Sequence, residues 1–178
     1  MASTQRIWLF GGSFDPPHRG HLLLLKSAVA ELRPEKTYLV PAGQSPLKSP
    51  ARASAEDRLA LCRAFVAGLP AGLRRGIKIS DCEIRRSGPS YTCASLRLFH
   101  EKFPNAELYF LLGSDAAADF PRWRNTADIR KLSRFVIGRR PKTAWPGAKA
   151  RLPETLRLAG TFPDISSTRL RAELLCGR

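Results

Sequence analysis

The sequence is poor in cysteine, in acidic residues and in long apolar runs, and each shortage removes a class of protein. Its four cysteines form no CxxC pair and have no close histidine partners, which argues against a disulfide framework and a zinc site. No stretch is long enough to cross a bilayer, and residues 1–6 lack the charged and then apolar pattern of a signal peptide. We therefore expect reduced thiols and a cytoplasmic protein that does not enter a membrane.

Acidic residues are half as frequent as basic ones: 15 Asp and Glu against 30 Lys and Arg give a net charge of +15. Such an excess raises the local concentration of polyanions, and both nucleotides and nucleic acids qualify. The basic residues are spread along the chain, with a denser stretch over residues 139–151, which favours a solvated basic surface over a nucleic-acid footprint. No RRM-like aromatic motif or recognition-helix pattern is evident, so we expect no specific nucleic-acid partner.

The 178 residues, 43% of them hydrophobic, suffice for a proper core, and we expect one domain over residues 1–178. Short apolar runs predict buried strands at 7–10, 37–40, 77–80, 108–112 and 135–137. Helical periodicity predicts helices at 20–32, 55–66, 93–103 and 126–132. This alternation indicates an α/β fold, a Rossmann-like, doubly wound and mostly parallel sheet with helices on both faces.

The sequence also indicates helix caps and loops between these elements. Ser54 with Asp57 resembles a capping box, and Thr92 and Asn125 occupy expected helix N-cap positions. Two long loops rich in proline and basic residues, 41–53 and 139–153, are of the kind that often close over ligands.

The first chemical motif follows the first predicted strand and spans Gly11–His21. Its glycines let the backbone approach a bound group, and the free N–H groups at the next helix start favour an anion. The motif therefore predicts phosphate binding. There is no GxxxxGK followed by Ser or Thr, and no GxGxxG after this strand, so neither a P-loop NTPase nor an ordinary dehydrogenase fits.

Two histidines of this motif, His18 and His21, are three residues apart and so share one face of the first helical turn, which Gly20 leaves open. Metal ligation is the less favoured reading, because His100 is the only other histidine and no Cys or carboxylate cluster lies nearby in sequence. Histidines that merely cap the helix are a second alternative. Capping alone does not account for the glycine turn and both imidazoles together.

Residues 12–21 resemble the first motif of the HxGH nucleotidylyltransferases, and residues 164–171 are similar to that family's second motif, Ile-Ser-Ser-Thr-x-x-Arg. The second motif opens the last helix of the family and meets ATP phosphates; an ordinary capped helix is the alternative. The resemblance implies that His18, His21 and Arg169 are catalytic, with Arg171 as the alternative site of the family arginine. It implies nucleotide contacts at Gly12, Ser13, Phe14, Gly113, Asp115, Ser166, Ser167 and Thr168.

Residues 86–92 and 113–124 resemble the nicotinate mononucleotide adenylyltransferase branch, so the resemblance covers nearly the whole chain. It implies that Thr92 and the backbone at Arg124 recognise the pyridine carboxylate and that Trp123 packs beside the ring. The Asp115 position lies close to the nucleotide sugar in the family, and a carboxylate is a sensible acceptor for ribose hydroxyls. The alternatives are a helix N-cap for Asp115 and ordinary core packing for Trp123.

The loop after the second strand departs from the family, since residues 45–48 read Ser-Pro-Leu-Lys where many members carry Pro-His-Lys. Lys48 either reaches a substrate phosphate or is a solvated surface lysine. The resemblance implies ATP and nicotinate mononucleotide as substrates, Mg²⁺ bound through the ATP phosphates, and no metal held by protein side chains alone; self-association stays open. Alternatives are another HxGH adenylyl- or cytidylyltransferase, a basic nucleic-acid-binding protein, and a catalytically silent relative.

Overall fold

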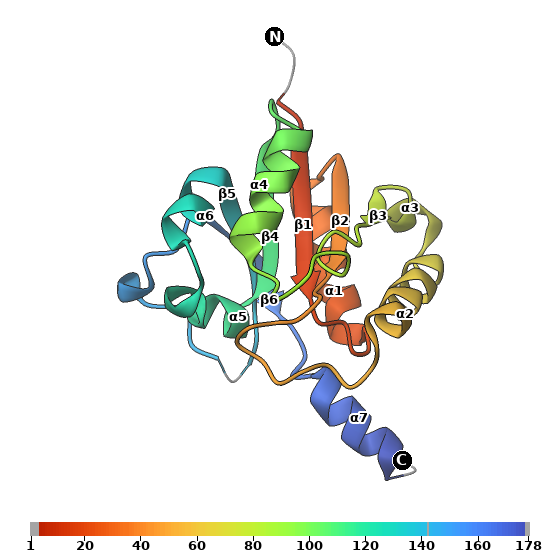
Figure 1. The fold of residues 1–178 in the computed structure, drawn as a ribbon. Coiled ribbons are helices and arrows are strands. Elements are labelled where there is room, and N and C mark those ends of the chain that lie inside the picture. The colour runs from red at the N-terminus through yellow and green to blue at the C-terminus, as the bar shows by residue number, and fades with distance from the viewer. Residues whose placement is uncertain (1–3, 142, 177–178) are drawn as a thin grey trace.

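The computed structural model describes residues 4–141 and 143–176, which form a six-stranded sheet with parallel pairing throughout (Figure 1). The strand order is β3-β2-β1-β4-β5-β6. The strands are β1 (Arg6–Gly12), β2 (Lys36–Pro41), β3 (Ile77–Ile79), β4 (Glu107–Gly113), β5 (Ser133–Arg139) and β6 (Thr155–Thr161). This arrangement confirms the predicted doubly wound α/β class, and the sheet is parallel throughout rather than mostly so.

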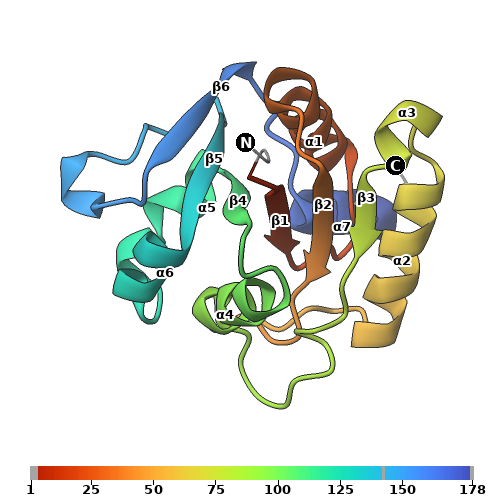
Figure 2. The ribbon, with the colours of Figure 1, turned by 90° about the horizontal axis from the view of Figure 1, so that it is seen from above.

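Helices connect the strands and cover both faces of the sheet (Figures 1 and 2). They are α1 (Arg19–Leu32), α2 (Ala55–Ala67), α3 (Ala71–Arg74), α4 (Thr92–Lys102), α5 (Ser114–Ala118), α6 (Thr126–Leu132) and α7 (Ser167–Leu175), with 3-10 turns at Phe120–Arg122 and Ala148–Ala150. Among the described residues, no helix is both long and apolar enough to cross a membrane.

The core has two halves because successive residues of a strand point to opposite faces of the sheet. In β1, Ile7 and Leu9 pack with α4, α5 and α6, whereas Trp8 and Phe10 pack with α1 and α2. All four are at most 3% exposed. The continuous apolar run of β1 is therefore the signature of a strand buried on both faces.

The structure differs from the sequence-based expectations at β6 and at Thr92, and it confirms the N-cap position of Asn125. β6 was not predicted, because this edge strand offers only a short alternation, with Leu158 buried and Leu156 half-buried. Thr92 is not an N-cap: Tyr91 takes that position without a side-chain capping bond, and Thr92 is the first helical residue. Asn125 is at the predicted N-cap, but it has φ of 54° and makes no capping bond.

The predicted cap of α2 is confirmed. The Ser54 hydroxyl oxygen accepts the backbone N–H of Asp57 at 3.0 Å and so caps α2. All four cysteines are free, and two of them, Cys62 and Cys93, are buried in the core.

Candidate active site

The predicted site residues gather at the carboxyl ends of β1 and β4, which are neighbours in the sheet although they are far apart in sequence. The chain order reverses between these two strands, and ligands of open α/β sheets bind at such a switch point. Figure 1 shows the loop after β2 and helix α7 at this end of the sheet. Both motifs of the sequence are therefore brought to one edge.

The two motif histidines lie side by side, as their three-residue spacing predicted, and their rings stack. Their ring centroids are 3.7 Å apart and the rings are inclined by 26°. His18 is the N-cap of α1, where its Nδ1 accepts the N–H of Gly20 at 3.1 Å, and the His21 Nδ1 accepts the N–H of His18 at 3.1 Å. Both rings thus cap the helix through one nitrogen, and each keeps the other nitrogen for another partner.

These bonds fix the state of the imidazoles. A ring nitrogen that accepts an N–H bond carries no proton, so each neutral ring is protonated at Nε2. Burial, followed by the positive charge of Arg140, lowers the pKa of His18 to about 4. Burial, then His18, Arg140 and Lys48, lowers the pKa of His21 to about 2. Near neutral pH the site therefore presents two uncharged Nε2–H donors.

Neighbouring residues hold the pair in place. A Cβ at Gly20 would lie 3.0 Å from the His18 ring, so glycine allows this packing, as the sequence predicted. The Phe14 ring lies at a centroid distance of 4.9 Å from His21 and is only 1% exposed. The expectation of a nucleotide contact at Phe14 is therefore restricted to its backbone, because its side chain belongs to the core. At Gly12 a Cβ would meet this same Phe14 ring at 3.1 Å.

The second motif begins α7 beside the first motif. The Ser166 hydroxyl accepts the N–H of Arg169 at 3.2 Å and caps the helix, and the Ser167 hydroxyl donates to the carbonyl of Pro16 at 2.8 Å. Ser167 therefore joins the two motifs directly, across 151 residues of chain.

The two arginines of α7 have different surroundings, and the catalytic role expected of Arg169 stays a prediction. The Arg169 guanidinium pairs with Glu173 one turn further along the helix at 2.8 Å, and its side chain is 70% exposed. Arg171 instead donates to the backbone carbonyl of Asp15 and to its carboxylate, and its side chain is 25% exposed. The structure thus brings Arg171, not Arg169, to the first motif, because positions two apart point to different sides of a helix.

Asp15 joins three segments of the site, although the sequence did not single it out. Besides Arg171, its carboxylate accepts the backbone N–H of Arg52 at 2.8 Å and that of Ala53 at 3.3 Å. Asp15 is 4% exposed. It therefore fixes the far end of the loop after β2 against the first motif.

Arg140 is a second residue that sequence reasoning missed. Its Nε pairs with the Asp115 carboxylate at 3.0 Å and its guanidinium donates to the carbonyl of Ile165 at 2.8 Å. Arg140 follows β5 directly. Because the carboxyl ends of parallel strands lie at one edge of the sheet, its position after a predicted strand could have indicated that it belongs to the site. Asp115 lies in the first turn of α5, whose N-cap is Gly113, so the N-cap alternative for Asp115 is wrong.

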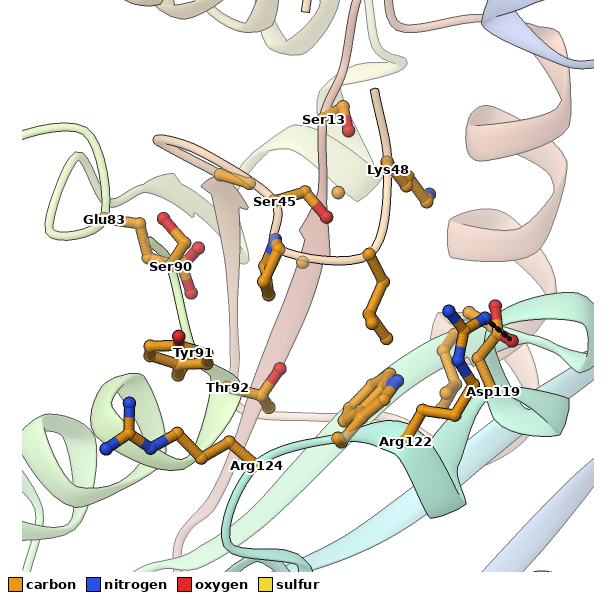
Figure 3. A pocket seen from close by; sticks show the side chains of 18 of the residues that line it. Ser13, Ser45, Lys48, Glu83, Ser90, Tyr91, Thr92, Asp119, Arg122 and Arg124 are labelled. Carbon is orange, nitrogen blue, oxygen red and sulfur yellow. Dashed lines mark hydrogen bonds and ion pairs between the residues drawn. The ribbon is translucent and has the colours of Figure 1, made fainter. Parts of the chain in front are cut away.

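A pocket adjoins the first motif and holds the residues expected to bind the mononucleotide (Figure 3). Thr92 lines it from the start of α4, and the Arg124 guanidinium lies 4.8 Å from the centre of the Tyr91 ring. Trp123 both lines the pocket and packs edge-on against Phe110 at a centroid distance of 5.8 Å. Trp123 therefore lines the pocket and also packs against the core.

The loop after β2 forms another wall of this pocket through Ser45, Pro46, Leu47 and Lys48. Lys48 is close enough to His21 to lower the pKa of that ring, and Ser13 lines the pocket beside it. Lys48 therefore lines the pocket and lies near the histidine pair. In the described part of the chain, no group of three or more His, Cys, Asp or Glu side chains is placed to hold a metal ion.

Comparisons with known proteins agree with this geometry. A family model described as cytidylyltransferase-like matches residues 9–173. A probable nicotinate-nucleotide adenylyltransferase of Roseiflexus sp. (strain RS-1) is 41% identical and spans 99% of this chain and 89% of its own. One of the same name from Gloeobacter violaceus is 36% identical over 98% of this chain and 86% of its own.

Among solved structures, Plasmodium falciparum nicotinic acid mononucleotide adenylyltransferase complexed with NaAD has a TM-score of 0.80 at 22% identity, covering 96% of this chain and 84% of that one. At this identity the likeness shows the fold alone. The full-length sequence matches carry the assignment: the chain belongs to the cytidylyltransferase-like family, among relatives named nicotinate-nucleotide adenylyltransferase.

Proposed function

We propose that this chain transfers the adenylyl group of ATP to nicotinate mononucleotide, forming nicotinate adenine dinucleotide and pyrophosphate in NAD biosynthesis. One observation carries the proposal at the level of the site: two neutral histidine donors stand beside a pocket lined by Thr92, Trp123 and Arg124. N–H donors for phosphate beside a pocket with aromatic and cationic side chains suit a substrate that joins a phosphate to a pyridine ring.

The chemistry needs little from the protein beyond positioning and charge stabilisation. The 5′-phosphate of nicotinate mononucleotide is already an ionised nucleophile, so no side chain has to be activated. Its oxygen attacks the α-phosphorus of ATP, the bond from that phosphorus to the bridging oxygen breaks, and the electron pair leaves with pyrophosphate. The pocket holds the attacking phosphate in line with this bond.

In the proposal, the His18 and His21 Nε2–H groups donate to α- and β-phosphate oxygens as negative charge moves toward pyrophosphate. Because both rings are neutral in the protein without ligand, they contribute two directed N–H donors and not two fixed positive charges. The N-terminus of α7, with Ser166, Ser167 and Thr168, binds the outer phosphates, whose oxygens accept hydrogen bonds from free N–H groups and hydroxyls. Arg171 adds the guanidinium that was first expected from Arg169.

At the acceptor end, the Thr92 hydroxyl and the backbone at Arg124 would bind the pyridine carboxylate, and Trp123 would pack on the ring. Lys48 would hold the acceptor phosphate near the histidine pair. On the donor side, Gly113 would let the nucleotide approach the backbone, and Asp115 would accept ribose hydroxyls in place of its ion pair with Arg140.

We expect ATP to enter as its magnesium complex, in which phosphate oxygens and waters surround the ion, so that it belongs to the substrate. Action in the cytoplasm, one domain over residues 1–178 and the absence of a specific nucleic-acid partner also stay predictions.

The test uses purified protein, ATP, magnesium and one acceptor at a time: nicotinate mononucleotide, nicotinamide mononucleotide, phosphopantetheine or flavin mononucleotide. Pyrophosphate release and a dinucleotide product with nicotinate mononucleotide support the proposal. Turnover only with phosphopantetheine or the flavin would assign another reaction of the family. No turnover with any acceptor, together with salt-sensitive nucleic-acid binding, would favour a binding protein.

A further inference from the structure

A buried arginine outside both motifs connects the backbone segments that follow β1 and β2. Arg58 lies in the first turns of α2 and is 2% exposed. Its guanidinium donates to the carbonyl of Ser13 at 2.9 Å, to that of Ala42 at 2.5 Å and to that of Gly43 at 3.0 Å. Ser13 belongs to the turn after β1, and the other two residues follow β2. One side chain therefore holds the backbone after two neighbouring strands.

The Gly43 peptide is held from its other side as well. Its N–H donates to the Ser90 hydroxyl at 2.9 Å, and a Cβ at Gly43 would collide with the backbone carbonyl of Glu83. The buried Glu83 carboxylate in turn accepts the Ser95 hydroxyl at 2.6 Å. Figure 3 shows Glu83 and Ser90 together at one side of the pocket. The start of the loop is thus clamped between α2 and the segment before α4.

We propose that Arg58 is a positioning residue for adenylyl transfer. It sets the separation between the turn that precedes the histidine pair and the mononucleotide loop, defined as residues 43–53. Ser13 lines the pocket from the turn, and Ser45 and Lys48 line it from the loop, so a change in this separation moves donor and acceptor phosphates apart. The inference rests on the proposed function for its kinetic consequence and on geometry alone for its effect on the loop.

The guanidinium is matched to this task. Three carbonyls from two separate segments meet at the donors of one rigid planar fork, whereas a lysine offers a compact charge that cannot reach all three. A misplacement of about 1 Å between reacting groups costs on the order of a hundredfold in rate. Arg58→Lys should therefore lower kcat/KM for both substrates about ten- to a hundredfold, with a clear fall in kcat.

The experiment compares Arg58→Lys and Arg58→Met with Cys62→Ala, which removes a buried thiol one turn further along the same helix but none of the three carbonyl contacts of Arg58. Two quantities are measured well below the melting temperature of each variant: steady-state kinetics with each substrate varied, and hydrogen exchange of the mononucleotide loop and of α2. If Arg58→Met does not fold, Arg58→Lys alone decides the matter.

The proposal expects faster exchange in residues 43–53 and reduced kcat for the Arg58 variants, with α2 protected as in the wild type. Cys62→Ala should melt earlier but keep the loop protected and keep its kcat. Wild-type kcat and loop exchange in a folded Arg58→Lys variant would overturn the proposal. If the wild type has no adenylyltransferase activity, the proposed function fails, while the exchange data still decide whether Arg58 holds the loop.

Discussion

Acidification should destabilise the folded protein through His18, and the His18→Asn variant should lack this effect. The folded protein holds the pKa of His18 at about 4, against 6.5 for a free imidazole, chiefly because burial penalises the charged ring. Protons therefore bind the unfolded chain more readily. The stability that depends on a neutral His18 is complete above about pH 6.5 and is lost as the pH falls from there toward about 4.

The size of the effect follows from the two pKa values. At about pH 5 nearly every unfolded chain carries a protonated His18, whereas only about a tenth of folded chains do. The free energy of unfolding should then fall by about 2 kcal/mol between about pH 8 and pH 5 from this residue alone. His21, whose pKa is about 2, adds a loss in the same direction.

Urea unfolding at the two pH values measures the difference. Asparagine is the chosen replacement because it caps helices well and can accept the Gly20 N–H that His18 accepts now. The variant should lose about 2 kcal/mol less than the wild type on acidification. His100→Asn, at an exposed position of α4, is the control and should decline like the wild type. An identical decline in wild type and His18→Asn would refute the account of a buried neutral ring.

Further predictions concern catalysis. His18→Ala and His21→Ala should each reduce turnover about a hundredfold or more while the protein stays folded, because each removes a preorganised donor; near-normal kcat/KM in both folded variants would show that the site is elsewhere. Arg171→Lys should impair the use of ATP more than that of the mononucleotide, whereas Arg169→Lys should stay near normal, since Arg169 pairs with Glu173 in solvent. Steady-state kinetics at limiting and saturating ATP separate the two arginines, and the reverse ranking would return the phosphate role to Arg169.

The sequence predicted the parts of this fold that have strong local signals. The run Ile7–Phe10 identified a strand buried on both faces, and the structure has β1 there with its side chains in both halves of the core. The edge strand β6 escaped prediction because burial on one side leaves a weaker pattern, and Gly160, with φ of 82°, interrupts it.

The site likewise contains residues that a local sequence pattern predicts and residues that none does. The His18–His21 spacing predicted that the two imidazoles lie on one side of the helix start, and the structure adds that their rings stack. The roles of Asp15, Arg58 and Arg140 depend on contacts with segments that are distant in the chain, and no local sequence pattern predicts these contacts. The two arginines of α7 show the limit of a motif: it places both guanidinium groups in a helix but does not decide which partner each side chain finds.

A competition experiment tests the central claim most directly. Limiting ATP labelled at the α-phosphorus is mixed with magnesium, the protein, and equal amounts of nicotinate and nicotinamide mononucleotide, and the labelled products are separated. Because both acceptors compete for one enzyme, the ratio of labelled dinucleotides equals the ratio of their kcat/KM values. The account predicts label mainly in nicotinate adenine dinucleotide and none in pyrophosphate. Equal labelling of the two dinucleotides would contradict the proposed selectivity, and label only in unreacted ATP or in AMP would contradict the proposed reaction.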